Sequence, residues 1–403
     1  MRKTITLSLL LALSTVSCQR DDRAAIATLP NPAGDDSRFP NLSAAVDGSL
    51  WMSWYERAGA STTALRVARF DGQDWSEPQT VVASDALFVN WADFAAVSEY
   101  APGSLVAHWL ERSGDAPYAY DVRLAFSTDG GASFSESQLA HSDGTSSEHG
   151  FVSHIPIDGG VGLIWLDGRD TASLGTMQLR YAEFSGDGSI SHAAVLDERV
   201  CECCQTAAIR LSDRTLVAYR DRSPAEIRDI AMTVRRGERW SSLGVPVADN
   251  WQVSGCPVNG PAVAANGKTL ALAWYTQADG QGRVRIARST DRGHSFRETE
   301  LELTTETLGR ADIVVLDNAD IVVSWLQRDD VDSGAAVWRV QRFDLHGRPG
   351  PALDIAVVSA ERSSGFARMQ KTGNRLLFAW TDTHADQPRV YSALVSLAAL
   401  ARR

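Results

Sequence analysis

Four residues with charged or reactive side chains recur at a nearly constant interval. They are Arg38, Asp93, His149 and Cys203, which follow one another at intervals of 54 to 56 residues. A guanidinium group binds a carboxylate through two parallel hydrogen bonds, and a carboxyl group in a dry pocket can act as a general acid. The regular interval indicates equivalent places in a repeated unit, so we expect the four residues on one face of the fold.

An apolar segment that ends in an aromatic residue marks the repeated unit, sixteen positions after each of these four. Seven such aromatic residues are present, 51 to 56 positions apart: Trp54, Trp109, Trp165, Tyr219, Trp274, Trp325 and Trp380. Turns such as Asp47-Gly48 favour a tight hairpin before the aromatic segment. Residues 65–69 alternate like a half-exposed strand. Self-similarity at a fixed period is the signature of a repeat architecture.

Four short antiparallel strands repeated around a ring form a β-propeller, which removes most exposed sheet edges. We therefore predict an all-β fold with one β-propeller domain over residues 24–403. Seven four-stranded blades are expected, with six as the alternative if one unit is irregular. The last unit ends after its third strand, so an N-terminal strand at residues 24–29 is predicted to complete it and close the ring.

The first residues have the features of a secretory signal. Arg2 and Lys3 precede an apolar stretch, and the small residues before Cys18 resemble a bacterial lipobox. We expect a signal peptide over residues 1–18, lipidation of Cys18 and a tether over residues 19–23. The protein is then exported to the periplasm or cell surface, with lipidated Cys18 as its membrane contact, and Gln19 favours the outer membrane.

The composition narrows the choice of partners. The chain has 50 acidic and 39 basic residues, a formal net charge of −11, which argues against nucleic acid or anionic lipid as the main partner. We expect a monomer that binds an acidic glycan or another small extracellular ligand.

Two turns share a short sequence motif. Residues 127–134 and 289–296 both begin Ser-Thr-Asp and end Ser-Phe, and they resemble the Asp-box, or BNR repeat, of the sialidase superfamily. Arg38-Phe39-Pro40 resembles the Arg-Ile-Pro segment of sialidases, and this resemblance implies that Arg38 binds a substrate carboxylate. Asp93 lies where sialidases place their acid/base aspartate.

The resemblance has limits. Sialidase catalytic domains have six blades, whereas seven units are present here. Their reaction also needs further arginines and a tyrosine nucleophile paired with a glutamate, the known exception to two-carboxylate chemistry. Glu202 and Tyr275 are the candidates for that pair, so an enzyme must show a Tyr-Glu pair near Asp93 and more arginines that point inward. The expected ligand-binding set is Arg38, Asp93, His149, Arg222 and Arg310.

Four cysteines follow Cys18, namely Cys201, Cys203, Cys204 and Cys256. An even number in an oxidising compartment favours two disulfides. The alternative is a thiolate cluster for copper or zinc, since soft thiolates select Cu(I) and Zn²⁺, with His149 as a further ligand.

These patterns leave three functions open. The preferred one is a cell-envelope lipoprotein that binds an acidic glycan at the central face and needs no cofactor. The second is an exo-acting sialidase-like glycosidase with Asp93 as acid/base. The third is a copper- or zinc-binding protein built on the four cysteines.

Overall fold

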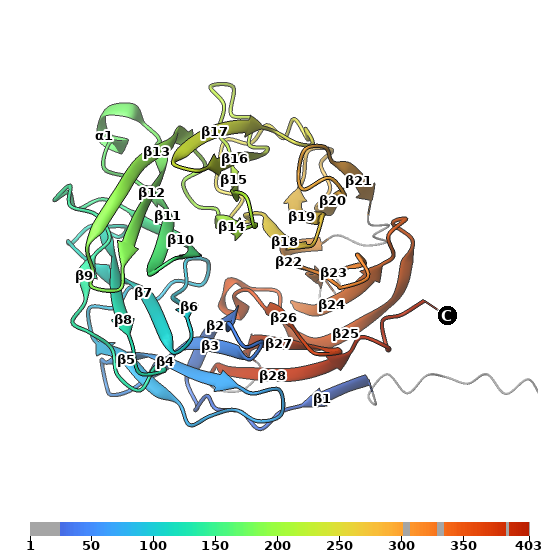
Figure 1. Cartoon of the computed structure of the whole chain (residues 1–403), viewed down its shortest axis with the longest axis horizontal. Coiled ribbons are helices and arrows are strands. Elements are labelled where there is room, and N and C mark those ends of the chain that lie inside the picture. Colours follow the sequence, from blue (N-terminus) through green and yellow to red (C-terminus); the bar gives the residue numbers. More distant parts are fainter. Residues whose placement is uncertain (1–24, 301–306, 329–333, 384–386, 403) are drawn as a thin grey trace, which may run out of the picture.

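The computed structural model describes residues 25–300, 307–328, 334–383 and 387–402. Within these ranges, seven four-stranded antiparallel sheets are arranged as blades around a ring (Figure 1). The predicted all-β propeller is confirmed, and the six-blade alternative is wrong. The predicted signal peptide, lipidated Cys18 and tether lie outside the described residues.

The first four blades follow one another along the chain. Blade 1 contains β2 (Ser37–Ala44), β3 (Leu50–Arg57), β4 (Thr63–Phe70) and β5 (Gln79–Ser84). Blade 2 contains β6 (Ala96–Ala101), β7 (Ser104–Arg112), β8 (Tyr120–Ser127) and β9 (Gln138–Leu139). Blade 3 contains β10 (His149–Ile157), β11 (Gly160–Asp167), β12 (Met177–Ser185) and β13 (Ile190–Val200). Blade 4 contains β14 (Ala207–Arg210), β15 (Thr215–Arg220), β16 (Ile230–Arg236) and β17 (Arg239–Gly244).

The remaining blades continue the pattern. Blade 5 contains β18 (Ala262–Asn266), β19 (Thr269–Thr276), β20 (Arg283–Ser289) and β21 (Arg297–Glu300). Blade 6 contains β22 (Thr307–Val315), β23 (Ile321–Arg328), β24 (Ala335–Phe343) and β25 (Pro349–Ser359). Blade 7 contains β26 (Arg368–Thr372), β27 (Arg375–Asp382), β28 (Arg389–Ser396) and the N-terminal strand β1 (Ile26–Thr28). Short helical turns lie at α1 (Thr171–Leu174) and η2 (Arg362–Ser364).

The ring closes as predicted, because β1 pairs antiparallel with β28 at the outer edge of blade 7. Ile26 lies opposite Val395, and Thr28 lies opposite Ala393. The first and last segments of the propeller are therefore joined in one sheet, and the edge that β28 would otherwise expose is covered.

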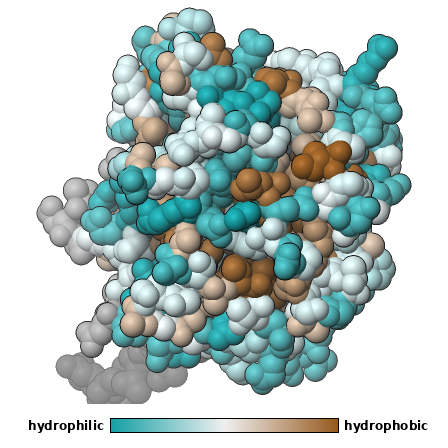
Figure 2. Space-filling model, turned by 90° about the vertical axis from the view of Figure 1, so that its left-hand side faces the viewer, coloured by the Kyte–Doolittle hydropathy of each residue, from teal (hydrophilic) through white to brown (hydrophobic). Residues whose placement is uncertain are grey.

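Hydrophobic side chains fill the spaces between adjacent blades. One cluster joins Trp54 of blade 1 to Leu377 of blade 7, and another joins Val322 of blade 6 to Phe378 of blade 7. The second strands are buried almost throughout, since each lies inside its blade and between two neighbours. On the side seen in Figure 2, apolar residues form small separate patches among hydrophilic ones. No described helix is long and apolar enough to cross a membrane.

Polar side chains join one blade to the next around the channel. Five of them accept a hydrogen bond from a backbone N–H of the following blade: Thr381 from Phe39 at 2.9 Å, Asp93 from Phe151 at 2.8 Å, Gln205 from Gly260 at 3.0 Å, Asn259 from Arg310 at 2.6 Å and Asp312 from Met369 at 2.8 Å. Buried backbone donors need such partners, because an unpaired one costs free energy. We call these five bonds the interblade hydrogen bonds.

The interblade hydrogen bond of Thr381 joins the last blade to the first and can be tested alone. Thr381→Val keeps the side-chain shape but leaves the N–H of Phe39 unpaired, so the free energy of unfolding should fall by about 1–3 kcal/mol in denaturant titrations. Thr381→Ser keeps the hydroxyl group and serves as the control. A Val variant as stable as the Ser variant would show that this bond does not stabilise the ring.

Candidate functional site

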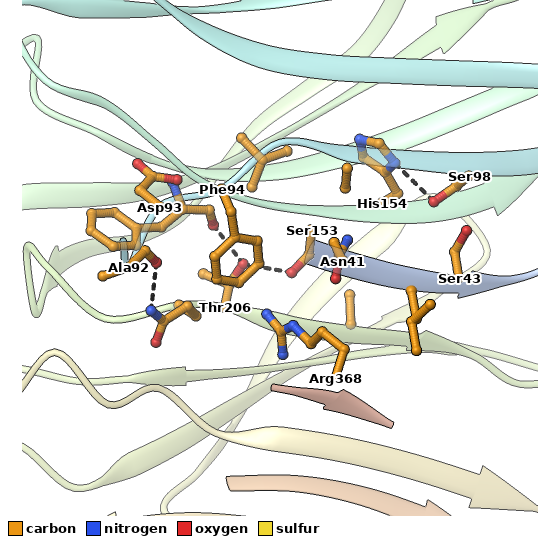
Figure 3. A pocket seen from close by; sticks show the side chains of 16 residues that line it. Asn41, Ser43, Ala92, Asp93, Phe94, Ser98, Ser153, His154, Thr206 and Arg368 are labelled. Carbon is orange, nitrogen blue, oxygen red and sulfur yellow. Dashed lines mark hydrogen bonds between the residues drawn. The ribbon is translucent and has the colours of Figure 1, made fainter. Parts of the chain in front are cut away.

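A cavity of about 180 Å³ lies in the central channel. The inner strands β2, β6, β10, β14 and β26, with the segments just before β6 and β14, supply its lining. Figure 3 shows side chains from these different blades turned toward the same space. The cavity is therefore built by the closed ring and belongs to no single blade.

Arg368, the first residue of β26, brings a guanidinium group to this cavity. Its guanidinium carbon lies 4.3 Å from the ring centre of Phe94 and 5.9 Å from that of Phe366. Its Nε is buried without a hydrogen-bond partner, and no ion pair within 4.0 Å holds the group among the described residues. Stacking on aromatic faces positions the cation but leaves its hydrogen-bond donors unused.

Asp312 is the acidic residue whose charge acts on Arg368, and it partly offsets the lowering of the guanidinium pKa by burial. Its oxygens are already engaged, because they accept the backbone N–H groups of Ile313 and Met369, each at 2.8 Å. Burial raises the pKa of Asp312, and burial lowers the pKa of Arg368 while Asp312 opposes that shift. The guanidinium group thus lies in a poorly hydrated place without a carboxylate in contact with it.

Neutral polar groups make up most of the remaining lining. Ser153 and Thr206 share a hydrogen bond of 2.7 Å, and Nδ1 of His154 lies 3.0 Å from the hydroxyl of Ser98. Burial lowers the pKa of His154 to about 4, so its ring is neutral at neutral pH. Asn41 is half-buried, and no hydrogen bond of its amide is found within the described part of the chain. It is therefore available to a ligand, as Arg368 is.

Asp93 lies at the wall of the cavity and is almost fully buried, with 1% of its surface exposed. Oδ1 accepts the interblade bond from Phe151, and Oδ2 lies 3.3 Å from the hydroxyl of Tyr120. A Cβ atom at position 150 would lie 1.9 Å from Oδ2, so Gly150 is what allows this close approach. Burial raises the pKa of Asp93 to about 8, and the carboxyl group is mostly protonated at neutral pH.

Tyr120 connects Asp93 to a second carboxyl group. Its hydroxyl donates a hydrogen bond of 2.7 Å to Glu148, whose pKa burial raises to about 7. Tyr120 is fully buried and stacks on Phe88 with ring centres 4.1 Å apart. The structure therefore contains a Tyr-Glu pair beside Asp93, formed by residues other than the predicted Glu202 and Tyr275.

These ionisation states decide the charge of the cavity. Asp93 is mostly protonated and His154 is neutral at neutral pH. Among the described lining residues, Arg368 is then the group that carries a full charge. The cavity is a polar, positively charged site inside an acidic protein.

Arg38, expected to bind a carboxylate, is turned to its own blade instead. Its guanidinium forms an ion pair with Asp36, which also binds Arg57. The hydrogen bond from Arg57 is the main cause of the lowered pKa of Asp36, and Arg38 contributes to that shift. Arg38 does not line the cavity, although residues 41–43 of β2 do.

His149 lies in a buried cluster on the side of β10 away from the cavity. Its ring stacks on His141 with centres 3.7 Å apart and planes 10° apart, and Asp121, Asp143 and Asp167 surround the two rings. Arg169 forms ion pairs with Asp143 at 3.2 Å and Asp167 at 2.7 Å. Two stacked, nearly parallel imidazoles cannot both point a lone pair at one ion, and Arg169 already pairs with Asp143 and Asp167 beside His149, so this cluster fits a buried ion-pair network better than a metal centre.

The other predicted residues lie outside the cavity. The guanidinium of Arg310 donates to Ser364 Oγ at 2.8 Å and to the carbonyls of Gly365 and Glu361, and it stacks on Trp91. Burial lowers its pKa to about 10. Three hydrogen bonds and the stacking on Trp91 therefore hold Arg310 in place, whereas no hydrogen bond holds Arg368 among the described residues.

Glu202 and Arg222 bind each other at the rim. Glu202 also accepts a hydrogen bond of 3.1 Å from Arg228, and Arg222 also binds Glu226. The carboxylate of Glu202 has no hydrogen bond to Tyr275, whose ring packs edge-on against Trp251. The structure does not bring the predicted Tyr-Glu pair together.

The four cysteines after Cys18 are free thiols, so the two predicted disulfides are not confirmed. The sulfur of Cys201 lies 3.1 Å from that of Cys204 and 3.9 Å from that of Cys203. Cys256 approaches Cys203 from the loop before blade 5. Three of the four sulfurs therefore lie as close together as the alternative, a thiolate cluster, requires.

Sequence reasoning missed the cavity residues Arg368 and Asn41, and also the Tyr120–Glu148 pair next to Asp93. Counting sixteen positions back from each aromatic residue finds the start of an inner strand, whereas Asn41 and Arg368 lie further along. The available signal was a short pattern in which a polar residue follows a phenylalanine by two positions. Phe366-Ala367-Arg368 and Phe39-Pro40-Asn41 both have this pattern.

Comparisons with known proteins support the fold. No protein-family model matches the chain, and no curated protein matches it. Among solved structures, the Hadza microbial sialidase Hz136 is 14% identical, with a TM-score of 0.53 over 87% of this chain and 77% of the other. The PL25 ulvan lyase bound to -[GlcA(1-4)Rha3S]- is 13% identical, with a TM-score of 0.53 over 93% and 95%. A protein of unknown function from Dyadobacter fermentans is 13% identical, with a TM-score of 0.51 over 92% and 98%.

At these identities the likeness shows a shared sialidase-like propeller fold. It agrees with the resemblance found in the sequence.

The raised pKa values of Asp93 and Glu148 predict a pH-dependent stability. The folded protein keeps protons that the unfolded chain releases, so both groups destabilise the fold as pH rises from about 4 to about 8, each by at most about 1.4 kcal/mol per pH unit. Asp93→Asn mimics the protonated acid. Its free energy of unfolding, relative to the native chain, should therefore increase across this range in urea titrations. A difference independent of pH would mean that Asp93 ionises normally.

Proposed function

We propose that the protein is a glycan-binding propeller whose central cavity holds the terminal acidic sugar of an extracellular glycan. The observation that carries this proposal is the guanidinium group of Arg368, which lies in the cavity without an ion pair. A buried cation is costly unless it is paired and hydrogen-bonded. A ligand carboxylate would supply both the charge and two acceptors in the geometry that guanidinium groups prefer.

The lining favours a sugar over a simple anion. Asn41 offers a free amide, and hydroxyl groups of Ser98, Ser153 and Thr206 face the same cavity. Such donors and acceptors suit the hydroxyl groups of a carbohydrate. A cavity of about 180 Å³ suits one sugar unit at the end of a chain.

The structural neighbours support a glycan ligand in general terms. They include a sialidase and a lyase bound to -[GlcA(1-4)Rha3S]-, a fragment with both a carboxylate and a sulfate. The sequence predicts export and lipidation of Cys18, which would expose the cavity to extracellular glycans. We therefore propose that the protein binds its acidic glycan at the cell envelope.

Arg368→Gln tests the role of the guanidinium group. Loss of a charged hydrogen-bonding pair should weaken binding of N-acetylneuraminate or glucuronate by about 10–100-fold in calorimetric titrations. Galactose, which has no carboxylate, should bind equally weakly to both proteins.

Arg38→Gln is the matched control, because Arg38 pairs with Asp36 and lies off the cavity. Its affinity for the acidic sugars should stay unchanged. The opposite pattern, with binding lost in the Arg38 variant and kept in the Arg368 variant, would move the site to the rim and contradict the proposal.

A second candidate is exo-acting glycoside hydrolysis. Asp93, Tyr120 and Glu148 provide an acid with a raised pKa beside a hydrogen-bonded Tyr-Glu pair. We place it second because Tyr120 is fully buried under Phe88, where a sugar carbon cannot reach its hydroxyl. Arg368 is also the one arginine among the described lining residues, whereas the sialidase reaction needs further arginines.

A fluorogenic sialoside separates the two candidates. A binding protein should release no fluorophore, with or without the Asp93→Asn substitution. Turnover by the native chain that disappears in Asp93→Asn would establish a hydrolase with Asp93 as its acid and would displace the first proposal.

A further inference from the structure

Three cysteine sulfurs gather at the start of blade 4. Cys201, Cys203 and Cys204 lie in the short loop between β13 and β14, and their sulfur atoms all lie within 4.8 Å of one another. Cys201 and Cys204 are fully buried, and Cys203 is half-buried. The chain thus holds three soft ligand atoms at one point that the glycan site does not use.

The surroundings favour a thiolate at Cys201, whereas neighbouring sulfurs and burial raise the pKa values of Cys203 and Cys204. Arg228, whose side chain is 4% exposed, donates a hydrogen bond of 3.3 Å to the sulfur of Cys201. Arg220 is buried nearby, with its guanidinium fixed by the carbonyls of Asn259, Arg228 and Tyr275. Positive groups beside a sulfur stabilise the thiolate, the form that binds metals, and an N–H donor to sulfur is a common outer-sphere contact of metal sites.

The number of sulfurs indicates the ion. Structural Zn²⁺ takes four ligands in a tetrahedral arrangement, whereas three sulfurs form the compact group here. Cys256 would be the fourth, and it approaches Cys203, but it is exposed and does not belong to the compact group of three. Cu(I) is satisfied by soft thiolates alone and does not require a fourth ligand.

We propose that Cys201, Cys203 and Cys204 bind one Cu(I) ion as three thiolates. Binding releases the thiol protons to solvent and changes no oxidation state, because the ion arrives as Cu(I). The site rests on residues other than those of the proposed glycan cavity, so either proposal can fail without the other.

The ion would also stiffen the wall of the channel. Gln205 directly follows Cys204, and its side chain donates to the carbonyl of Ala92 at 2.5 Å and accepts from Gly260 at 3.0 Å. Cys203 packs against the hydrophobic cluster that contains Trp91 and Phe94. A metal bound by this loop therefore holds residues of three blades in place.

The test uses the purified full chain, reduced and kept without oxygen. Titration with Cu(I) against a competing chelator, followed by native mass spectrometry, should show one copper ion per chain. Cys203→Ser removes a ligand at a half-buried position and should weaken Cu(I) binding by more than about 100-fold, beyond the range for outer-sphere changes. Arg228→Gln should weaken it by about 10–100-fold.

Cys256→Ser is the matched control and should bind Cu(I) like the native chain. Circular dichroism and thermal unfolding of both Ser variants separate lost ligands from lost folding. Two results would overturn the proposal. One is an as-isolated mass lower by four hydrogens, which indicates two disulfides. The other is a zinc ion lost equally in Cys203→Ser and Cys256→Ser, which indicates a four-thiolate zinc site.

Discussion

Closure of the ring brings seven inner strands to face one another, and their buried polar groups must find partners in neighbouring blades. The interblade hydrogen bonds meet this requirement at five of the junctions between blades. They also fix which side chains are available to a ligand. Asp312 and Asn259 accept backbone N–H groups, and the guanidinium of Arg310 is held by carbonyls and a hydroxyl. Polar side chains of the channel that lack such a partner are therefore candidates for ligand binding.

Arg368 and Asn41 are the cavity groups without a described hydrogen-bond partner, and they lie on the inner strands of adjacent blades, β26 and β2. Other buried side-chain atoms of the described residues also lack a partner, such as Nε of Arg228 and Arg288, so the candidacy of Arg368 rests on its place in the cavity together with its unpaired Nε. Asp93 combines both roles, because one oxygen holds Phe151 while the other faces Tyr120. Its raised pKa follows from burial, which structural and catalytic positions share, so the pKa alone does not identify a catalyst.

The architecture was predictable because it depends on features that repeat. The seven aromatic residues, such as Trp54 and Trp380, lie on the second strands, which every blade needs for packing. The N-terminal strand has no blade of its own, so it was expected to complete the last blade, as β1 does by pairing with β28. The candidate site was harder, because it depends on local register. Bulges between Arg38 and Asn41, and between Gly150 and Ser153, interrupt the pairing at the start of β2 and β10. Each added residue turns the next side chains to the other face.

The bulges explain why Arg38 and His149 do not line the cavity, while Asn41 and Ser153 do. Contacts between blades could not be predicted either, because nothing in the sequence spacing of Tyr120 and Glu148 indicates that their side chains form a hydrogen bond.

A crystal structure of the chain soaked with glucuronate or N-acetylneuraminate would test the central claim most directly. The account predicts the sugar in the central cavity, with its carboxylate against the guanidinium of Arg368 and a hydroxyl group at the amide of Asn41. A carboxylate bound at the rim on Arg38, with the cavity empty, would contradict it.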